Sequence, residues 1–488
     1  MSNGLEYKSI AIRDAMIVNG KGTPPYGPCD ILIEDGRIKD IVNVDSISLG
    51  RYKVKRPEAE HEIVAKGMYV IPGLVDMHIH INIDDEKCGP KGTEYAYKLC
   101  LAHGITTIRT CGFGTDEKLL EHKRLSEENK IVAPRIMVLG SWPAEATNVE
   151  ESREAVRKLK NLGVDGIKMI PRPHVTAEML EAIADEARKV GLPGGIAIHH
   201  AQNSELDALI TSNAAKEMLS IEHTYGIPQA ALPGTQSFPP DYNYSNEVDR
   251  FRMSGYIWTE ADNYPNRVKQ VFDTLLENKT VWDPTMVVYE GHRDYERVKS
   301  LPWHEQYTVR QLWEAYSPSP GRHATHFFNW KTSDEIAWKE KYQIWMKWVK
   351  YYFDHGGRLI AGTDTAFIYA LFGFAMIREL ELFQEAGIHP IDVIKIATTN
   401  AHKTLGNTDL ANGIRQGAPA DIAIIDGNPL DNFKVMYGTG VNRYSADGLK
   451  VTHGGGVKWT IKNGVLFDSG ELLKDVEEYV KEQGPKNP

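Results

Sequence analysis

The stretch Ile71-Pro72-Gly73-Leu74-Val75-Asp76-Met77-His78-Ile79-His80 is an apolar run that ends in two histidines. Side chains two positions apart on a strand point to the same side of it, so both imidazoles can face one ion at the end of this strand. A lone His-x-His pair is common by chance. The pair indicates a metal site only if other ligand residues lie at the ends of other strands of the same sheet.

Alternating strand-like and helix-like segments follow this stretch, which is typical of parallel βαβ units. The helix predicted over 176–190 places Met179, Leu180, Ile183 and Ala187 on one face. Strands are predicted over 70–80, 104–111, 135–140, 166–170, 195–200, 218–224, 280–288 and 358–364. Eight parallel strands in series predict a closed (β/α)8 TIM-like barrel of the α/β class.

The two ends of the chain differ from this middle part. Short β-branched runs with turns such as Asp35-Gly36 occupy the first sixty or so residues, and the last eighty return to this pattern, with Asn463-Gly464 as a turn. We therefore predict a small β-sandwich domain built from both chain ends. Residues 1–68 and 409–488 would form it, and residues 69–408 would form the barrel.

Two connections in the barrel, 225–278 and 289–357, are much longer than usual βα loops and are rich in aromatic residues. They are predicted either to form lids or substrate walls, or to pack a helix onto the barrel or onto another subunit. The residues of the second insertion that raise this question are Trp338, Tyr342, Trp345 and Trp348.

Composition narrows the class of protein. The chain has 488 residues, 42% of them apolar, and a formal net charge of -10 with scattered basic residues, which argues against nucleic acid as a partner. Four cysteines without close pairing indicate free thiols, and no secretory leader or bilayer-spanning run is found. We expect a soluble cytoplasmic protein without a membrane partner, which acts on a small-molecule substrate as a homo-oligomer.

Further candidate ligands lie at the predicted ends of other strands, where barrel enzymes carry their chemistry. Lys168 is flanked by apolar residues, and a buried unpaired ammonium group would be costly. His199 and His200 end the fifth strand, His223 ends the run from Leu219 to Glu222 in the sixth, and Asp364 ends the eighth. A single histidine on an apolar strand is usually a core residue, but several at the ends of one set of strands predict a metal site.

This pattern resembles the amidohydrolase superfamily, and in particular its binuclear metal-dependent hydrolases related to imidazolonepropionase and the Xaa-Pro dipeptidases. The resemblance covers nearly the whole chain. Besides the histidine pair, it is carried by His103-Gly104-Ile105-Thr106-Thr107-Ile108-Arg109, Ser220-Ile221-Glu222-His223, Ala361-Gly362-Thr363-Asp364 and the tail from Gly413 to Ile422.

The resemblance implies a two-metal site. His78, His80 and Asp364 would bind the buried ion, His199 and His223 the more exposed one, and a carbamylated Lys168 would bridge them. His199 is preferred to His200 by the strand phase, although His200 would replace it if the strand ended one residue later. Zinc suits the histidine-rich set, and manganese, cobalt and iron stay open.

A metal-bridging hydroxide would then attack a carbonyl, with Asp364 and His223 as the predicted catalytic residues and Asp364 as the group that moves the proton. Tyr225 and Tyr289 could assist the oxyanion. Arg172 and His174 follow the strand of Lys168 and could meet a substrate carboxylate or amide, unless they are simply solvated. Trp142 and Tyr289 could form an apolar wall, and the predicted substrate-binding residues are Trp142, Arg172, His174, Tyr225 and Tyr289.

The leading prediction is hydrolysis of the C–N bond of an N-acyl amino acid, a dipeptide-like amide or a cyclic amide. Hydrolysis of a lactone or ester, or deamination at a single metal, are alternatives, since specificity lies in loops on a shared barrel. Deaminases of this superfamily lack the bridging lysine, so Lys168 argues against that alternative. A binding protein that has lost catalysis would be expected to have gaps in the ligand set, which is complete here.

Overall fold

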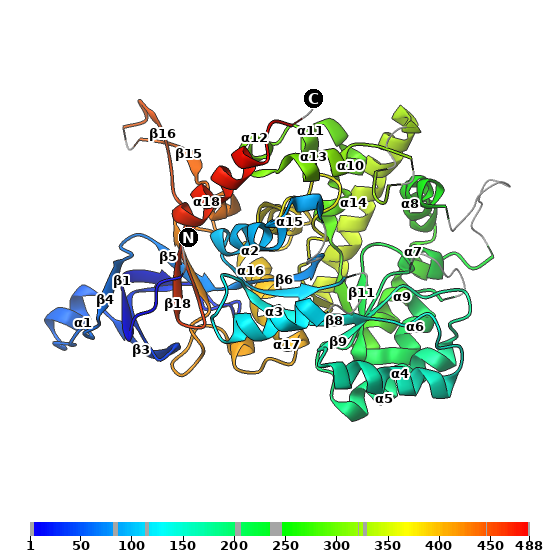
Figure 1. The fold of residues 1–488 in the computed structure, drawn as a ribbon, viewed down its shortest axis with the longest axis horizontal. Helices are drawn as coiled ribbons and strands as arrows, with labels where there is room; N and C mark the ends of the chain where they lie inside the picture. The colour runs from blue at the N-terminus through cyan, green and yellow to red at the C-terminus, as the bar shows by residue number, and fades with distance from the viewer. Residues whose placement is uncertain are drawn as a thin grey trace.

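The computed structural model describes residues 4–81, 86–112, 117–200, 206–234, 246–320, 322–325, 329–445 and 447–486. A curled sheet of eight strands lies at its centre, in the order β13-β12-β11-β10-β9-β8-β7-β6, and its strand pairs are parallel. Helices that follow the strands surround this sheet (Figure 1). The strands are β6 (Leu74–Ile79), β7 (Ile105–Thr110), β8 (Arg135–Ser141), β9 (Gly166–Met169), β10 (Ile196–Ile198), β11 (Leu219–Glu222), β12 (Val281–Asp283) and β13 (Arg358–Leu359).

Backbone hydrogen bonds join the first strand of this sheet to the segment after the last one. The Met77 amide donates to the Ala361 carbonyl at 2.9 Å, and the Asp364 amide donates to the His78 carbonyl at 2.7 Å. The His80 amide donates to the Thr365 carbonyl, also at 2.7 Å. The sheet is thereby closed, and the predicted TIM-like barrel is confirmed.

The helices are set by their caps and apolar faces. In α5 (Ala177–Val190), the Thr176 side chain accepts a hydrogen bond from the Met179 amide, and Gly191 ends the helix with φ of 71°. The other helices that cover the barrel are α2 (Gly92–Ala102), α3 (Glu117–Glu127), α4 (Val149–Leu162), α6 (Ala208–Ala215), α15 (Phe374–Glu385), α16 (Pro390–Lys395) and α17 (Ala401–Thr404).

The first predicted strand, 70–80, is wrong as a single element. It is divided into β5 (Tyr69–Pro72), which belongs to the small sheet, and the barrel strand β6. The chain changes sheets at Gly73, whose amide donates to the Asp421 carbonyl at 2.9 Å. A β-carbon there would lie 2.0 Å from the Thr106 hydroxyl, so the close approach requires glycine.

The seventh predicted strand, 280–288, is too long. Strand β12 ends at Asp283, and residues Met286–Tyr289 form a 3₁₀ helix instead. Pro284 follows the strand, and Thr285 adopts a left-handed backbone with φ of 47°, so the extended chain cannot continue. The apolar run that suggested a longer strand is therefore a buried helical turn.

Both ends of the chain contribute to one further sheet, in which the order β18-β17-β14-β5-β1-β2-β3 includes strands from either end and β4 pairs with β1. In Figure 1 the blue N-terminal strands lie beside the red β18. This confirms a small sheet domain built from both ends. Its strands are β1 (Ser9–Ile17), β2 (Tyr26–Glu34), β3 (Arg37–Asn43), β4 (His61–Val64), β5, β14 (Ile422–Asp426), β17 (Gly456–Lys462) and β18 (Val465–Asp468).

A few elements lie outside these two sheets and the helices of the barrel. A hairpin of β15 (Val441–Tyr444) and β16 (Val451–Gly454) projects from the molecule (Figure 1). The helix α1 (Ser46–Gly50) follows β3, and α18 (Ser469–Glu482) follows β18 and packs on α2.

The two long insertions are helical where the structure describes them. In α14 (Thr332–Asp354), the residues Trp338, Tyr342, Trp345 and Trp348 are all buried. Trp338 stacks on Tyr289 with ring centroids 5.8 Å apart. The aromatic residues of this helix therefore pack it onto the barrel. The remaining insertion helices are α7 (Ile227–Ala230), α8 (Glu247–Asp262), α9 (Pro265–Glu277), α10 (Glu290–Arg293), α11 (Tyr295–Lys299), α12 (Trp303–Tyr307) and α13 (Arg310–Tyr316).

All four cysteines carry thiols that are not joined in disulfides. Among the residues described above, no helix is both long enough and apolar enough to cross a bilayer.

Candidate metal centre

Four of the predicted ligands meet at the carboxyl ends of three barrel strands. His78 and His80 come from the end of β6, His223 follows β11, and Asp364 follows β13. The His80 Nε2 atom lies 2.8 Å from Asp364 Oδ1, which lies 3.6 Å from His78 Nε2, and Asp364 Oδ2 is 3.7 Å from His223 Nδ1. One ligand atom each of His78, His223 and Asp364 falls within a cluster 4.8 Å across.

Lys168 and His199 complete this group from β9 and the end of β10. The Lys168 Nζ atom lies 3.1 Å from His78 Nε2, and the residue is 6% exposed. The His199 ring packs edge-on against His223, with centroids 4.3 Å apart. All six predicted ligands therefore lie in one group at the barrel mouth.

His200 faces away from this group. Its Nε2 atom lies 2.9 Å from the Thr211 hydroxyl on α6, and its ring covers Gly226. The strand phase that favoured His199 agrees with this arrangement, because neighbouring residues at a strand end point to opposite sides.

The backbone at this site is strained at two of the predicted ligands. His223 has φ of 69° and Asp364 has φ of 54°, in the left-handed region that favours glycine. Such conformations cost free energy and persist where the surrounding structure holds them, often at functional sites. The strain turns both side chains toward the group.

Burial keeps the imidazoles of the group neutral. It lowers the pKa of His78, His199 and His223 well below the usual value for histidine, and their positively charged neighbours, Lys168 among them, lower it further. The pKa of His80 is also lowered by burial. Neutral imidazole is the form that binds a metal ion.

Hydrogen bonds indicate which nitrogen of two imidazoles carries the proton. The Thr285 hydroxyl donates to the Pro284 carbonyl at 2.8 Å, so its oxygen is left to accept from His223 Nδ1 at 2.7 Å. His78 Nδ1 lies 2.6 Å from the Glu222 carboxylate. In both residues the Nε2 lone pair is left for another partner.

The donors present fit divalent metal ions. Neutral imidazoles and a carboxylate are ligands that zinc, manganese, cobalt and iron accept. The buried His199 Nε2 atom has no hydrogen-bond partner within the described part of the chain, which suits a ligand position.

Sequence reasoning missed two charged residues beneath the group. Arg109 on β7 and Glu222 on β11 are both fully buried, and they form an ion pair at 2.8 Å. Each is the only charged residue of its strand, and an isolated charge in a strand is the signal that drew attention to Lys168. The same reasoning, applied to every charged residue in a predicted strand, would have found them.

The predicted substrate residues are only partly gathered at this site. The Tyr225 ring stacks on His199 at 5.4 Å, and the Tyr289 ring meets His223 edge-on at 5.8 Å. Trp142 follows β8, and its amide donates to the Lys168 carbonyl at 2.9 Å. Arg172 and His174 are exposed on the loop after β9.

A small cavity of about 40 Å³ opens beside His80 and is lined by Cys88, Phe367 and Phe372, among others. The Phe367 ring meets His80 edge-on at 5.1 Å. This cavity gives a largely apolar surface next to the group of predicted ligands.

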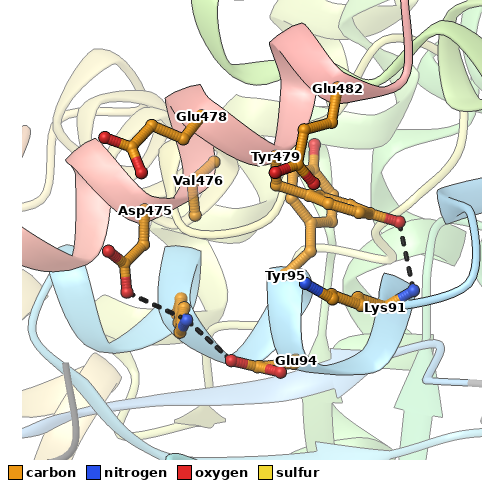
Figure 2. A pocket seen from close by; sticks show the side chains of 9 residues that line it. Lys91, Glu94, Tyr95, Asp475, Val476, Glu478, Tyr479 and Glu482 are labelled. Atoms are coloured by element: carbon orange, nitrogen blue, oxygen red, sulfur yellow. Dashed lines mark hydrogen bonds and ion pairs between the residues drawn. The ribbon is translucent and has the colours of Figure 1, made fainter. Parts of the chain in front are cut away.

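Another cavity, of about 270 Å³, lies between α2 and α18. Its lining is mainly charged, and Figure 2 shows the hydrogen bond that the backbone amide of Lys91, just before α2, donates to the Tyr479 hydroxyl on α18. None of the predicted ligands lines it. The Tyr479 hydroxyl also donates to the Cys88 carbonyl at 2.9 Å, so α18 is hydrogen-bonded to the backbone of both Cys88 and Lys91.

The fold and the site together define a (β/α)8-barrel protein with a group of histidine, lysine and aspartate side chains at its strand ends. Residues 69–235 match the model of the amidohydrolase family. The predicted resemblance to the amidohydrolase superfamily is thereby confirmed.

Three similar proteins span most of the chain. A dihydroorotase of Thermoanaerobacter sp. (strain X514) is 24% identical over 434 residues, which are 86% of this chain and 88% of that protein. A solved Xaa-Pro dipeptidase with bound methionine is 18% identical with a TM-score of 0.61, over 94% of this chain and 100% of the other. The bottromycin amidohydrolase is 17% identical with a TM-score of 0.68, over 98% and 91%. These two structures show the shared fold.

Proposed function

We propose that this protein is a binuclear metal-dependent hydrolase that cleaves the C–N bond of an amide, in an N-acyl amino acid, a dipeptide-like compound or a cyclic amide. The observation that carries the proposal is the meeting of His78, His80, Lys168, His223 and Asp364 within hydrogen-bonding or near-contact distance at the barrel mouth. The match to the amidohydrolase family supports the reaction class. Similar proteins named as a dihydroorotase, a dipeptidase and an amidohydrolase also support it.

The ligands divide between two ions in this proposal. His78, His80 and Asp364 would hold the more buried ion, and His199 and His223 the more exposed one. Lys168 would bridge them as a carbamate, which would also turn its costly buried cation into an anionic ligand. Two divalent ions, zinc in the first place, would supply an activated water and polarise the carbonyl of the substrate.

The side chains of the chain itself would move the proton and hold the substrate. Asp364 accepts a proton at a carboxylate oxygen and delivers it to the departing nitrogen, so that one group serves as base and then as acid. Its contact with His80 at 2.8 Å orients the carboxylate for this role. Tyr225 and Tyr289 flank His199 and His223 and would exclude water from that side.

The first test measures divalent ions per chain by elemental mass spectrometry, in protein purified without chelator and in the Lys168→Ala variant. About two ions in the parent and clearly fewer in the variant are expected, because a bridging ligand is lost. The matched control is Lys462→Met, which replaces a buried lysine that contacts Asn129 at 2.9 Å, far from the ligands in the fold. One ion in both parent and Lys168→Ala would instead support the single-metal deaminase alternative.

The second test addresses the bond that is cleaved. Metal-loaded protein is incubated with N-acyl amino acids, dipeptides and cyclic amides, and with lactones and esters of matched size. Faster release of product from the amides, lost in Asp364→Asn, would support the proposal. Turnover of lactones or esters alone would contradict the proposed cleavage of a C–N bond. It would still be consistent with a hydrolytic site.

A further inference from the structure

Glu222 is a buried carboxylate directly beneath the predicted metal ligands. It ends β11, is 0% exposed, and its Oε2 atom lies 2.6 Å from His78 Nδ1. The Ser220 hydroxyl donates to its other oxygen. His78 on β6 is thus held by a residue of β11, a strand that is not its neighbour in the sheet.

Arg109 decides the direction of these hydrogen bonds. Its guanidinium group donates to both oxygens of Glu222, at 2.8 and 3.0 Å, and also to the Met77 carbonyl. A guanidinium group has no acceptor, so Glu222 is the acceptor in this pair. Because the Glu222 carboxylate accepts, the His78 Nδ1 atom must carry the proton and donate it.

The other nitrogen of His78 is therefore the one with a lone pair. His78 Nε2 faces Lys168 Nζ at 3.1 Å and Asp364 Oδ1 at 3.6 Å, which is the direction of the predicted metal centre. A ligand imidazole that donates its second N–H to a carboxylate has a fixed tautomer and a fixed ring orientation, and it is a more basic ligand.

We propose that Glu222, held by Arg109, is a positioning residue that fixes the tautomer of His78 and thereby sets the affinity of the buried site for its divalent ion. The inference rests on the proposed metal centre. It adds one chain of contacts that runs from Arg109 on β7 through Glu222 on β11 to His78 on β6. It assigns to the Arg109–Glu222 pair a role beyond the compensation of two buried charges.

The test compares zinc affinity of the parent, Glu222→Gln and a control by competition with a chromophoric chelator. A glutamine can donate as well as accept, so it no longer forces the proton onto His78 Nδ1. We expect the tightest zinc affinity to fall about 10–100-fold in Glu222→Gln. The control is Glu379→Gln, another fully buried carboxylate, which accepts from the backbone amides of Met286 and Val287 and should leave zinc affinity unchanged.

A merely structural role predicts a different outcome. If Glu222→Gln unfolds at a lower temperature without metal but keeps the zinc affinity of the parent, the proposal is overturned. An equal loss of affinity in Glu222→Gln and Glu379→Gln would also overturn it. A parent protein that binds no zinc, manganese, cobalt or iron would contradict the proposed function itself, which separates the two failures.

A second measurement reads the tautomer itself. In metal-free protein labelled with ¹⁵N at histidine, the His78 signals, assigned by their absence in His78→Gln, should report a proton on Nδ1 in the parent and a mixture of tautomers in Glu222→Gln. The same tautomer in both would overturn the proposal. Should Glu222→Gln fail to fold, the double variant Arg109→Met/Glu222→Leu removes both charges together, which is milder than leaving one buried charge unpaired. It should show the same loss of affinity.

Discussion

His199 and His200 are neighbours in sequence that lie in different surroundings. His199 packs against His223 and Tyr225, whereas His200 meets Thr211 on the helix behind the strand. One residue therefore faces the predicted metal centre and the other ties β10 to α6.

Replacing each histidine with alanine should distinguish a role in metal binding from a role in stability. We expect His199→Ala to bind fewer divalent ions while its metal-free form unfolds near the parent's denaturant midpoint. His200→Ala should keep the metal content and lose about 1–3 kcal/mol of unfolding free energy, because the Thr211 hydroxyl loses a buried partner. Metal analysis and urea unfolding check both expectations. The reverse pattern would favour His200 as the ligand.

The buried charged residues of the barrel strands show which site residues could be predicted from the sequence and which could not. Lys168 was found because its burial had no explanation, and the structure places it 3.1 Å from His78. Arg109 and Glu222 carry the same signal, but they compensate each other across the barrel, and no local pattern reveals a partner 113 positions away. Pairing of this kind follows only from the closed sheet.

Elements were predictable where their periodicity was strong. Helix α5 was predicted to begin at Thr176 and begins at Ala177, with Thr176 as its capping residue. It ends at Val190 as predicted. The change of sheet at Gly73 and the helical turn Met286–Tyr289 were not predictable. Both lie in continuous apolar runs, whose sequence pattern is the same for a buried strand and for a buried helix. Only tertiary contacts decide which of the two forms.

The burial of the α14 aromatics gives a prediction for this helix. Trp345 is 0% exposed, so Trp345→Ala should leave a large cavity and cost about 3–5 kcal/mol of unfolding free energy. Chemical denaturation measures this cost. Ile336→Ala, at a residue of the same helix that is 51% exposed, is the matched control and should change stability by less than about 0.5 kcal/mol. Equal effects would show that α14 is not packed as described.

The unfolding free energy of the whole molecule depends on pH through the buried carboxyl group of Glu379. Burial, opposed by the hydrogen bonds from Met286 and Val287 and aided by the nearby carboxylates of Asp76 and Glu290, raises its pKa to about 8. The folded protein thus binds this proton more tightly than the unfolded chain. The resulting stabilisation is complete below the unfolded pKa of about 4.5 and is lost as pH rises through about 8.

We therefore expect the Glu379 contribution to unfolding free energy to decline between about pH 4.5 and 8. Glu379→Gln should remove this decline, and its stability relative to the parent should rise with pH. Urea unfolding across this range measures both. A constant difference between parent and variant at every pH would contradict the prediction.

The sheet shared by the two chain ends has a consequence during synthesis. Strand β5 ends at Pro72, but its partner β14 begins at Ile422, about 350 residues later. At roughly 5–20 residues per second, a ribosome needs about 18–70 s to cover that distance. During that interval one edge of β5 can pair with β1, but the edge that later pairs with β14 has no permanent neighbour. Nascent chains are therefore exposed to chaperones and to self-association until the distal strands emerge.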